Sequence, residues 1–273
     1  MSYATLMVYV NVDHASRALV SVSADLADRF SAKLIGLSSL AVVPPVVAEG
    51  VVVVDHASEL ELAQMRKSLA ETGEKFRAAA GVVRDTEWRS ALEIPTDALI
   101  RESRCADLIV IQKSGPPIDL YRAADPGTAI MGTGRPFLVV PGGLKTLAAE
   151  HILIGWKDTR EARRAVWDAL PFLRQAKRVI VIEICEGDQK EAAHHQVNDV
   201  VLYLARHKVR AEGRVETRLM GPGAAQIMGF AEDEGADLLV TGAYGHSRLN
   251  EWIFGGMTQD LLISTTICCL MSH

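Results

Sequence analysis

Apolar residues along this chain follow two patterns that alternate from end to end. Short continuous apolar runs, typical of strands buried on both faces of a parallel sheet, are separated by segments in which apolar residues recur every three or four positions, as on one face of a helix. In the first half these patterns predict strands at 6–12, 34–40, 86–92, 107–111 and 136–141. Between them they predict helices at 19–30 and 65–79 and a helix that opens at Pro95. In the second half they predict strands at 151–156, 179–185, 215–219, 237–241 and 267–271. The helices predicted between them are 162–173, 193–204, 224–231 and 256–264.

The two halves repeat one another. Asp13 and Asp158 each follow a first strand, 145 residues apart, and Cys105-Ala-Asp-Leu-Ile-Val corresponds to Gly235-Ala-Asp-Leu-Leu-Val, 130 residues further on. The first half is therefore longer, and the Val-rich segment 41–54 accounts for the excess. Alternating strands and helices predict the α/β class, as two tandem, open, mostly parallel five-stranded sheets with helices on both faces. We place the domains at 1–145 and 149–273, on either side of the break that follows Pro141-Gly-Gly.

Composition removes several classes of protein. The 29 basic and 34 acidic residues give a net charge of −5, which argues against a nucleic-acid partner. The longest apolar tract, 34–54, is interrupted by Pro44-Pro45, so no membrane span is expected. Four cysteines without Cys-x-x-Cys spacing, and no signal-peptide pattern, favour a cytoplasmic protein.

A glycine-rich segment follows the strand 237–241. It contains Gly242, Gly245, Gly255 and Gly256, and a helix is predicted to begin at its end. Glycine lets backbone N–H groups approach a ligand closely, and a helix N-terminus offers unpaired N–H groups and a positive dipole end. Because parallel sheets bind ligands beyond the carboxyl ends of their strands, this segment predicts a phosphate site. Two more of its residues, His246 and Arg248, either contact phosphate oxygens or are solvated.

This segment resembles the universal stress protein family, whose ATP-binding members carry Gly-x2-Gly-x9-Gly-(Ser/Thr) after the fourth strand. Gly242, Gly245 and Gly255 match at the family's spacing, and the resemblance covers almost the whole chain as a tandem pair. It implies the adenine nucleotide alpha hydrolase-like, Rossmann-like fold. It also implies a site for ATP, AMP or another adenine nucleotide, with or without Mg. The resemblance assigns to that site Asp158 at the sugar or base and Ile184 at the adenine. Gly256 and Met257, at the start of the predicted helix, offer backbone N–H groups to the phosphates, and whether the hydroxyl of Thr258 reaches them is left open.

Two departures from the family pattern restrict the prediction. Gly256 stands where the family has Ser or Thr, so one hydroxyl donor is missing, a loss of about 1 kcal/mol that weakens nucleotide binding without abolishing it. In the first half, Ile111-Gln-Lys-Ser-Gly-Pro-Pro replaces the glycine loop. We therefore expect one nucleotide site, in the C-terminal half. In the family the fifth strands pair across a two-fold interface, which here predicts an intrachain pseudo-dimer with 267–271 against 137–140.

Several residues have simpler interpretations. Asp13 is predicted to be a helix N-cap, and for Asp158 capping and ligand contact stay open. His194-His195 point in different directions on a helix, so they predict no metal site, and Cys268-Cys269 are expected to pack in the last strand. No catalytic residue is nominated.

The predicted function is a stress-response or signalling module that binds an adenine nucleotide. The alternative is an interaction scaffold that does not need a nucleotide. Slow ATP hydrolysis, a protein partner and a homodimer in addition to the pseudo-dimer are left open.

Overall fold

The computed structural model describes residues 2–43, 47–48, 51–52, 58–81, 83–113, 115, 119–245 and 256–273. Its strands are β1 Thr5–Tyr9, β2 Lys33–Leu40, β3 Val47–Ala48, β4 Val51–Val52, β5 Thr86–Leu92, β6 Leu108–Gln112, β7 Phe137–Val140, β8 His151–Trp156, β9 Arg178–Cys185, β10 Glu212–Thr217, β11 Leu238–Gly242 and β12 Cys268–Ser272. Its helices are α1 Arg17–Phe30, α2 Glu59–Ala79, α3 Pro95–Glu102, η1 Ser103–Cys105, α4 Pro126–Thr133, α5 Arg160–Asp168, α6 Leu170–Leu173, η2 Gly187–Gln189, α7 Lys190–Arg206, α8 Gly223–Asp233 and α10 Met257–Ser264.

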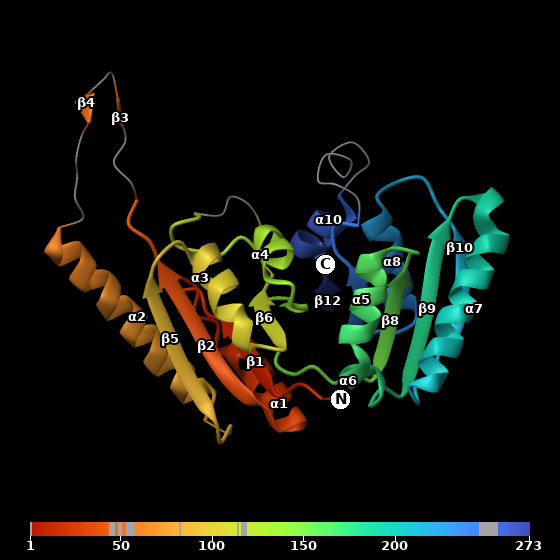
Figure 1. The fold of residues 1–273 in the computed structure, drawn as a ribbon, viewed down its shortest axis with the longest axis horizontal. Coiled ribbons are helices and arrows are strands. Elements are labelled where there is room, and N and C mark those ends of the chain that lie inside the picture. The colour runs from red at the N-terminus through yellow and green to blue at the C-terminus, as the bar shows by residue number, and fades with distance from the viewer. Residues whose placement is uncertain are drawn as a thin grey trace.

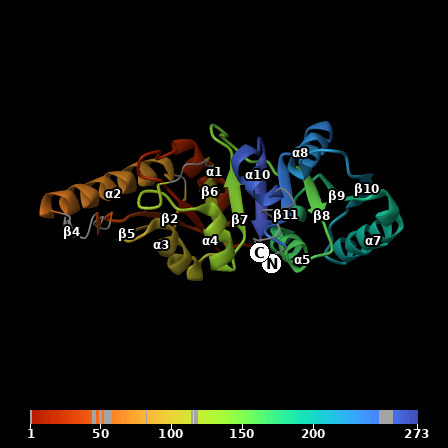
Figure 2. The same cartoon turned by 90° about the horizontal axis from the view of Figure 1, so that it is seen from above.

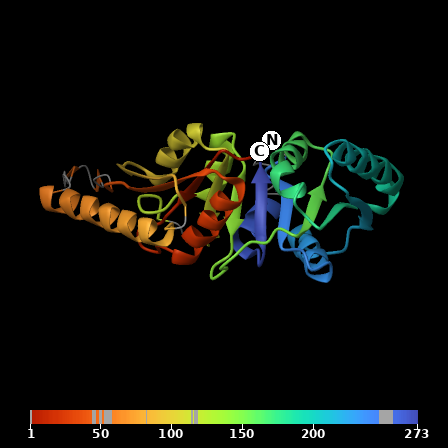
Figure 3. The ribbon, with the colours of Figure 1, turned by 90° about the horizontal axis from the view of Figure 1, so that it is seen from below.

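Ten strands form one sheet in the order β10-β9-β8-β11-β12-β7-β6-β1-β2-β5, with the two halves on either side in Figure 1. Within each half all neighbours are parallel and the order is the same, so the predicted repeat is confirmed. The halves join where β7 pairs antiparallel with β12, Val139 opposite Cys269 and Leu138 opposite Leu270. The predicted pairing of the fifth strands is therefore confirmed, and it merges the two predicted five-stranded sheets into one. Figure 3 shows β7 and β12 side by side near both chain ends.

Helices cover both faces of the sheet, as predicted. One face packs against α1, α2, α5, α6 and α7, and the other against α3, α4, α8 and α10. In Figure 2, α1 and α2 lie across the sheet from α3 and α4, and α5 and α7 lie across it from α8 and α10. Central strands are buried on both faces, and β6 and β7 consist almost entirely of fully buried aliphatic and aromatic residues. Such strands must appear in the sequence as continuous apolar runs, which is why they were predictable.

The predicted cap Asp13 is wrong, and of the two alternatives left open for Asp158 the structure does not show capping. The cap of α1 is Ser16, whose hydroxyl accepts a hydrogen bond from the N–H of Leu19 at 3.2 Å, while Asp13 is ion-paired with Arg122. In α5 the cap is Thr159, next to Asp158. Ser and Thr cap as well as Asp, so neighbouring residues compete for the position, and the backbone path decides which of them caps.

The predicted helix 162–173 is divided into α5 and α6. The break lies at Ala169, two residues before Pro171. Proline has no N–H to donate and its ring clashes with the carbonyl four residues earlier, so a continuous helix cannot pass through this point.

The two halves also meet below the sheet junction. Tyr3 near the N-terminus donates a hydrogen bond from its hydroxyl to the carbonyl of Asp168 at 2.6 Å. Its ring packs edge-on against Phe30 of α1, with ring centres 5.0 Å apart, and Phe30 packs edge-on against Phe172 of α6 at 5.1 Å. Aromatic pairs in this geometry stabilise a contact beyond the area they bury, so this aromatic cluster holds the two halves together. Among the described residues, no helix combines the length and apolar character that crossing a membrane requires.

Candidate functional site

The carboxyl ends of β8 and β11 are neighbours in the sheet, and they bring the first turn of α5 against the loop that begins at Gly242. A Cβ at Gly242 would lie 2.7 Å from the backbone N of Ala162 and 2.8 Å from the carbonyl carbon of Glu161. Real Cβ atoms do not approach backbone this closely, so the position requires glycine. The first glycine of the motif therefore also has a structural role, which is to let β11 end against the start of α5.

Gly245, three residues later, lies beside the same turn of α5. A Cβ here would be 3.3 Å from a carboxylate oxygen of Glu161 and 3.5 Å from the hydroxyl of Thr159. Glu161 is buried. Burial acts to raise the pKa of this carboxyl, but its ion pair with Arg160 lowers the pKa overall, so Glu161 stays ionised next to the loop.

Tyr244, between these two glycines, attaches the loop to α10. It adopts a left-handed backbone conformation, with φ of 55°. Its N–H donates to the hydroxyl oxygen of Thr258 at 3.1 Å, and its own hydroxyl donates to the side-chain oxygen of Gln259 at 3.3 Å. The Thr258 oxygen, expected near the phosphates, therefore accepts a bond that positions the loop, and its proton remains able to donate.

The N-terminus of α10 lies at the end of the glycine-rich segment. Gly256 is the N-cap residue and supplies no side-chain cap, while its carbonyl accepts the first helical bond, from Asp260, at 2.8 Å. The first N–H groups of a helix have no partner within it, so a helix N-terminus whose N-cap residue has no side chain favours an anion.

The other predicted site residues separate into two groups. Ile184, at the end of β9, and Met257 are partly buried against the core on the face of α8 and α10. Asp158 lies on the side of α5 and α7, half-exposed and ion-paired with Arg163. Three further residues named from the sequence, His246, Arg248 and Gly255, lie outside the described residues.

The first half fills the corresponding place with its own side chains. Asp125 is the N-cap of α4, and its carboxylate accepts a hydrogen bond from the N–H of Thr128 at 2.7 Å. Arg122, from the segment that replaces the glycine loop, donates to the carboxylate of Asp13 at 2.7 Å. The N–H of Ala41, after β2, donates to the carbonyl of Tyr121 at 2.8 Å, so this segment reaches across the ends of β1 and β2. Asp125 and Arg122 carried no motif and were missed from the sequence.

Comparison with known proteins assigns part of the chain to a family. The model of the universal stress protein family matches residues 148–273, which hold α10 and the glycine-rich segment. This part of the chain belongs to the universal stress protein family. Universal stress protein Slr1230 of Synechocystis is 24% identical over 171 residues, covering 59% of this chain and 56% of that protein. The matched part thus spans little more than half the length of that relative.

Solved structures of universal stress proteins share the fold of the whole chain. One from Archaeoglobus fulgidus superposes with a TM-score of 0.72 at 13% identity, covering 98% of this chain and 95% of its own. A second, a putative universal stress protein from Pseudomonas aeruginosa, gives a TM-score of 0.56 at 16% identity. The match covers 99% of this chain and 93% of that one. Both halves of this protein thus fit the architecture of the family.

The cysteines of the last strand pack as predicted, and the two adjacent histidines lie at the surface. His194 and His195 are exposed on α7, and no cluster of three or more metal-ligating side chains occurs in the part of the chain that the structure describes. Cys268 and Cys269 are buried and free, and burial raises the pKa of Cys268 to about 12. Both thiols therefore stay protonated and act as small packing groups.

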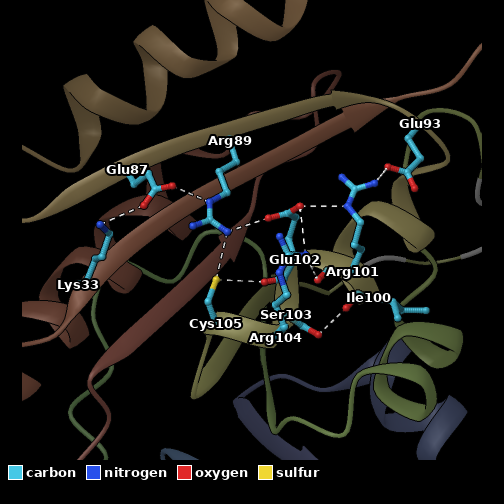
Figure 4. Close-up of polar contacts among 10 residues, drawn as sticks. All are labelled: Lys33, Glu87, Arg89, Glu93, Ile100, Arg101, Glu102, Ser103, Arg104 and Cys105. Atoms are coloured by element: carbon cyan, nitrogen blue, oxygen red, sulfur yellow. Dashed lines mark hydrogen bonds and ion pairs between the residues drawn. The ribbon is translucent and has the colours of Figure 1, made fainter.

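A charged network lies away from this site, on the edge strand of the first half (Figure 4). The buried Glu102 of α3 is bound by Arg89 at 2.7 Å, by Arg101 at 3.1 Å and by Arg104 at 3.6 Å. Arg89 also contacts Glu87 of β5 and donates to the sulfur of Cys105 at 3.1 Å. The network joins β5 to α3 and η1, and every charge in it has a partner, so its role is structural.

Proposed function

We propose that the universal stress protein domain at 148–273 binds an adenine nucleotide, ATP or a related one, at a single site in this half. Gly242 and Gly245 hold the loop against α5, and the N-terminal turn of α10 at Gly256, Met257 and Thr258 receives the phosphates. Ile184 borders the adenine. Asp158, half-exposed near the ends of the same strands, contacts the sugar or base.

The contrast between Gly256 and Asp125 carries this proposal. Both are N-cap residues at the same point of the repeated fold, before α10 and α4. Asp125 places a carboxylate on the first turn of its helix, 2.7 Å from an N–H, whereas Gly256 has no side chain to do so. A carboxylate at this point occupies the N–H groups that a phosphate would bind, and its charge repels the phosphate. For this reason α10 can accept a phosphate and α4 cannot.

The proposal extends to magnesium binding and to the rate of ATP hydrolysis. Because the described residues hold no cluster of metal-ligating side chains, a Mg²⁺ ion that accompanies the nucleotide would be held mainly by phosphate oxygens and water. We propose a binding module for stress response or signalling, in the cytoplasm, with slow hydrolysis at most.

The decisive experiment changes Gly256 in two opposite ways. In Gly256→Asp the second half receives the cap of the first, and we expect the ATP-dependent rise in melting temperature to disappear. In Gly256→Ser the hydroxyl typical of the family is restored, and one added hydrogen bond of about 1 kcal/mol predicts roughly fivefold tighter ATP binding. Because Asp and Ser both cap helices well, unliganded stability should rise by a few tenths of a kcal/mol in each.

The wild type sets the reference. ATP at about one hundred times its dissociation constant should raise the free energy of unfolding by roughly 2.7 kcal/mol. If Gly256→Asp binds ATP as tightly as the wild type, the N-terminus of α10 is not the phosphate site. If the wild type neither carries nucleotide after purification nor responds to ATP, the alternative function, an interaction scaffold that uses the same fold, replaces this one.

A further inference from the structure

A cavity of about 430 Å³ lies between α5 and α7, on the face of the sheet opposite α8 and α10. Figure 2 shows these two helices apart from each other on one side of β8 and β9. The cavity is lined by two aromatic rings, two valines and several polar side chains, namely Trp156, Tyr203, Val166, Val200, Asp158, Arg163, Gln196 and Asp199. Its volume is in the range of small-molecule sites.

In the first half the equivalent helices are closer together, and the cavity of about 360 Å³ found there lies between α2 and β5. There α1 contacts α2 directly, whereas α5 and α7 make no comparable contact. Phe76 of α2 is fully buried and packs on Trp88 of β5, with ring centres 5.4 Å apart. The space between these two helices thus differs between the two halves.

An uncompensated buried charge lies beside this cavity. Glu183 of β9 is 8% exposed and pairs in register with Trp156, and the amide of Gln196, turned toward it, donates to its two oxygens at 3.2 and 3.3 Å. Burial raises the pKa of Glu183, the charge of Asp158 raises it further, and Lys157 partly opposes them. Neither Glu183 nor Asp199 forms an ion pair with any residue that the structure describes.

The charge balance of the cavity is negative. Arg163 is neutralised by its ion pair with Asp158, which leaves Asp199 at the wall and Glu183 behind Gln196 without an ion pair to any described residue. A buried carboxylate without a positive partner is costly, and a cation that enters the cavity would remove that cost. The faces of Trp and Tyr rings attract cations as well, and the two valines suit an apolar chain.

We propose that the cavity between α5 and α7 binds a small organic cation, an ammonium group on a short apolar chain. The ammonium faces the carboxylates of Asp199 and Glu183, and the apolar chain lies against the aromatic and valine side chains. This site does not depend on the nucleotide proposal, because it lies on the opposite face of the sheet from α10 and shares with that proposal only Asp158 at its border.

The test compares three probes of equal length by calorimetry, which are pentan-1-amine, pentan-1-ol and pentanoate. We expect the amine to bind the wild type at least about tenfold more tightly than the alcohol, and pentanoate not to bind. The indole N–H resonance of Trp156, assigned by its loss in Trp156→Phe, should move with the amine. Equal binding of amine and alcohol would show an apolar pocket without charge recognition and would overturn the proposal, as would the absence of amine binding at millimolar concentrations.

Two isosteric variants and one control locate the charge recognition. Glu183→Gln and Asp199→Asn should each weaken amine binding about fivefold to tenfold and leave the binding of pentan-1-ol unchanged. Asp188→Asn, at an exposed position in η2, removes the same charge from the same half. It should leave the binding of pentan-1-amine and of pentan-1-ol unchanged. Thermal unfolding confirms that each variant is folded. Unchanged amine affinity in both Glu183→Gln and Asp199→Asn, or an equal loss in Asp188→Asn, would contradict the proposed site.

Discussion

Tyr244 of the second half lies over Gly127 of the first, with its hydroxyl where a Cβ on Gly127 would come within 2.5 Å. The ring of Tyr244 is buried, and its backbone forms the turn between the two glycines that face α5. Helices α4 and α10 meet at this point above the β7–β12 junction (Figure 1). The start of the glycine-rich loop is therefore held by a contact between the two halves.

Gly127→Ala should disturb that contact. The added methyl group displaces the tyrosine hydroxyl, and we expect a loss of about 1 kcal/mol in the free energy of unfolding, as for mild overpacking. Gly229→Ala is the matched control, because it is also within a helix and its Cβ would meet nothing within 4 Å. That variant should gain stability through helix propensity. Urea denaturation of both distinguishes steric displacement from propensity, and a stabilised Gly127→Ala would show that the tyrosine moves freely.

Asp125→Ala should remove the cap of α4. The lost hydrogen bond to the N–H of Thr128 predicts destabilisation of about 1 kcal/mol, and Asp125→Ser should recover most of it. Equal urea midpoints for the alanine and serine variants would mean that the carboxylate acts by its charge and not as a hydrogen-bond acceptor.

Glu102→Gln tests the charged network of Figure 4 and its dependence on pH. Burial acts to raise the pKa of Glu102, but its three arginine partners lower it overall, and hydrogen bonds from Arg89 and Lys33 lower the pKa of Glu87 to about 2. A carboxyl with a lowered pKa stabilises the fold above its unfolded-state pKa, and loses that contribution as pH falls through the folded value.

The free energy of unfolding of the wild type should therefore exceed that of Glu102→Gln by about 2 kcal/mol at pH 7. Because the amide imitates the protonated acid, this difference should shrink as pH falls from about 4.5 toward 2. Chemical denaturation at a series of pH values provides the measurement. A difference that is independent of pH would assign the effect to packing.

Glu183→Gln should change stability in the opposite direction from Glu102→Gln, and raise it. Burial raises the pKa of Glu183, so ionisation of this group above its unfolded-state pKa opposes folding. The amide carries no charge, and we expect a higher melting temperature than in the wild type at neutral pH, with the gain decreasing as the wild-type carboxyl becomes protonated in acid. A variant less stable than the wild type at pH 7 would show that the bond from Gln196 depends on the negative charge.

Much of the fold was predictable because buried parallel strands must be apolar at nearly every position. The strand predicted at 86–92 has the observed bounds, and the helix predicted at 256–264 begins one residue later, at Met257. Exact helix starts were harder to predict, since Asp13, Ser16, Asp158 and Thr159 are all good caps and the chain direction selects among them. For the site, the spacing of Gly242 and Gly245 indicated the loop, but no local pattern could show that both glycines lie against α5.

The sequence by itself determined the repeated α/β fold, the place of the glycine-rich loop and the absence of that loop from the first half, because these depend on residues close together in the chain. Tertiary structure decided what requires contacts between distant residues. It placed Asp125 as a carboxylate cap at the point where Gly256 offers its helix no side chain, and it joined the two sheets through β7 and β12. It also buried Glu183 beside a cavity without an ion pair to any described residue, in surroundings set by Trp156, Asp158 and Gln196, which are distant from it in the sequence.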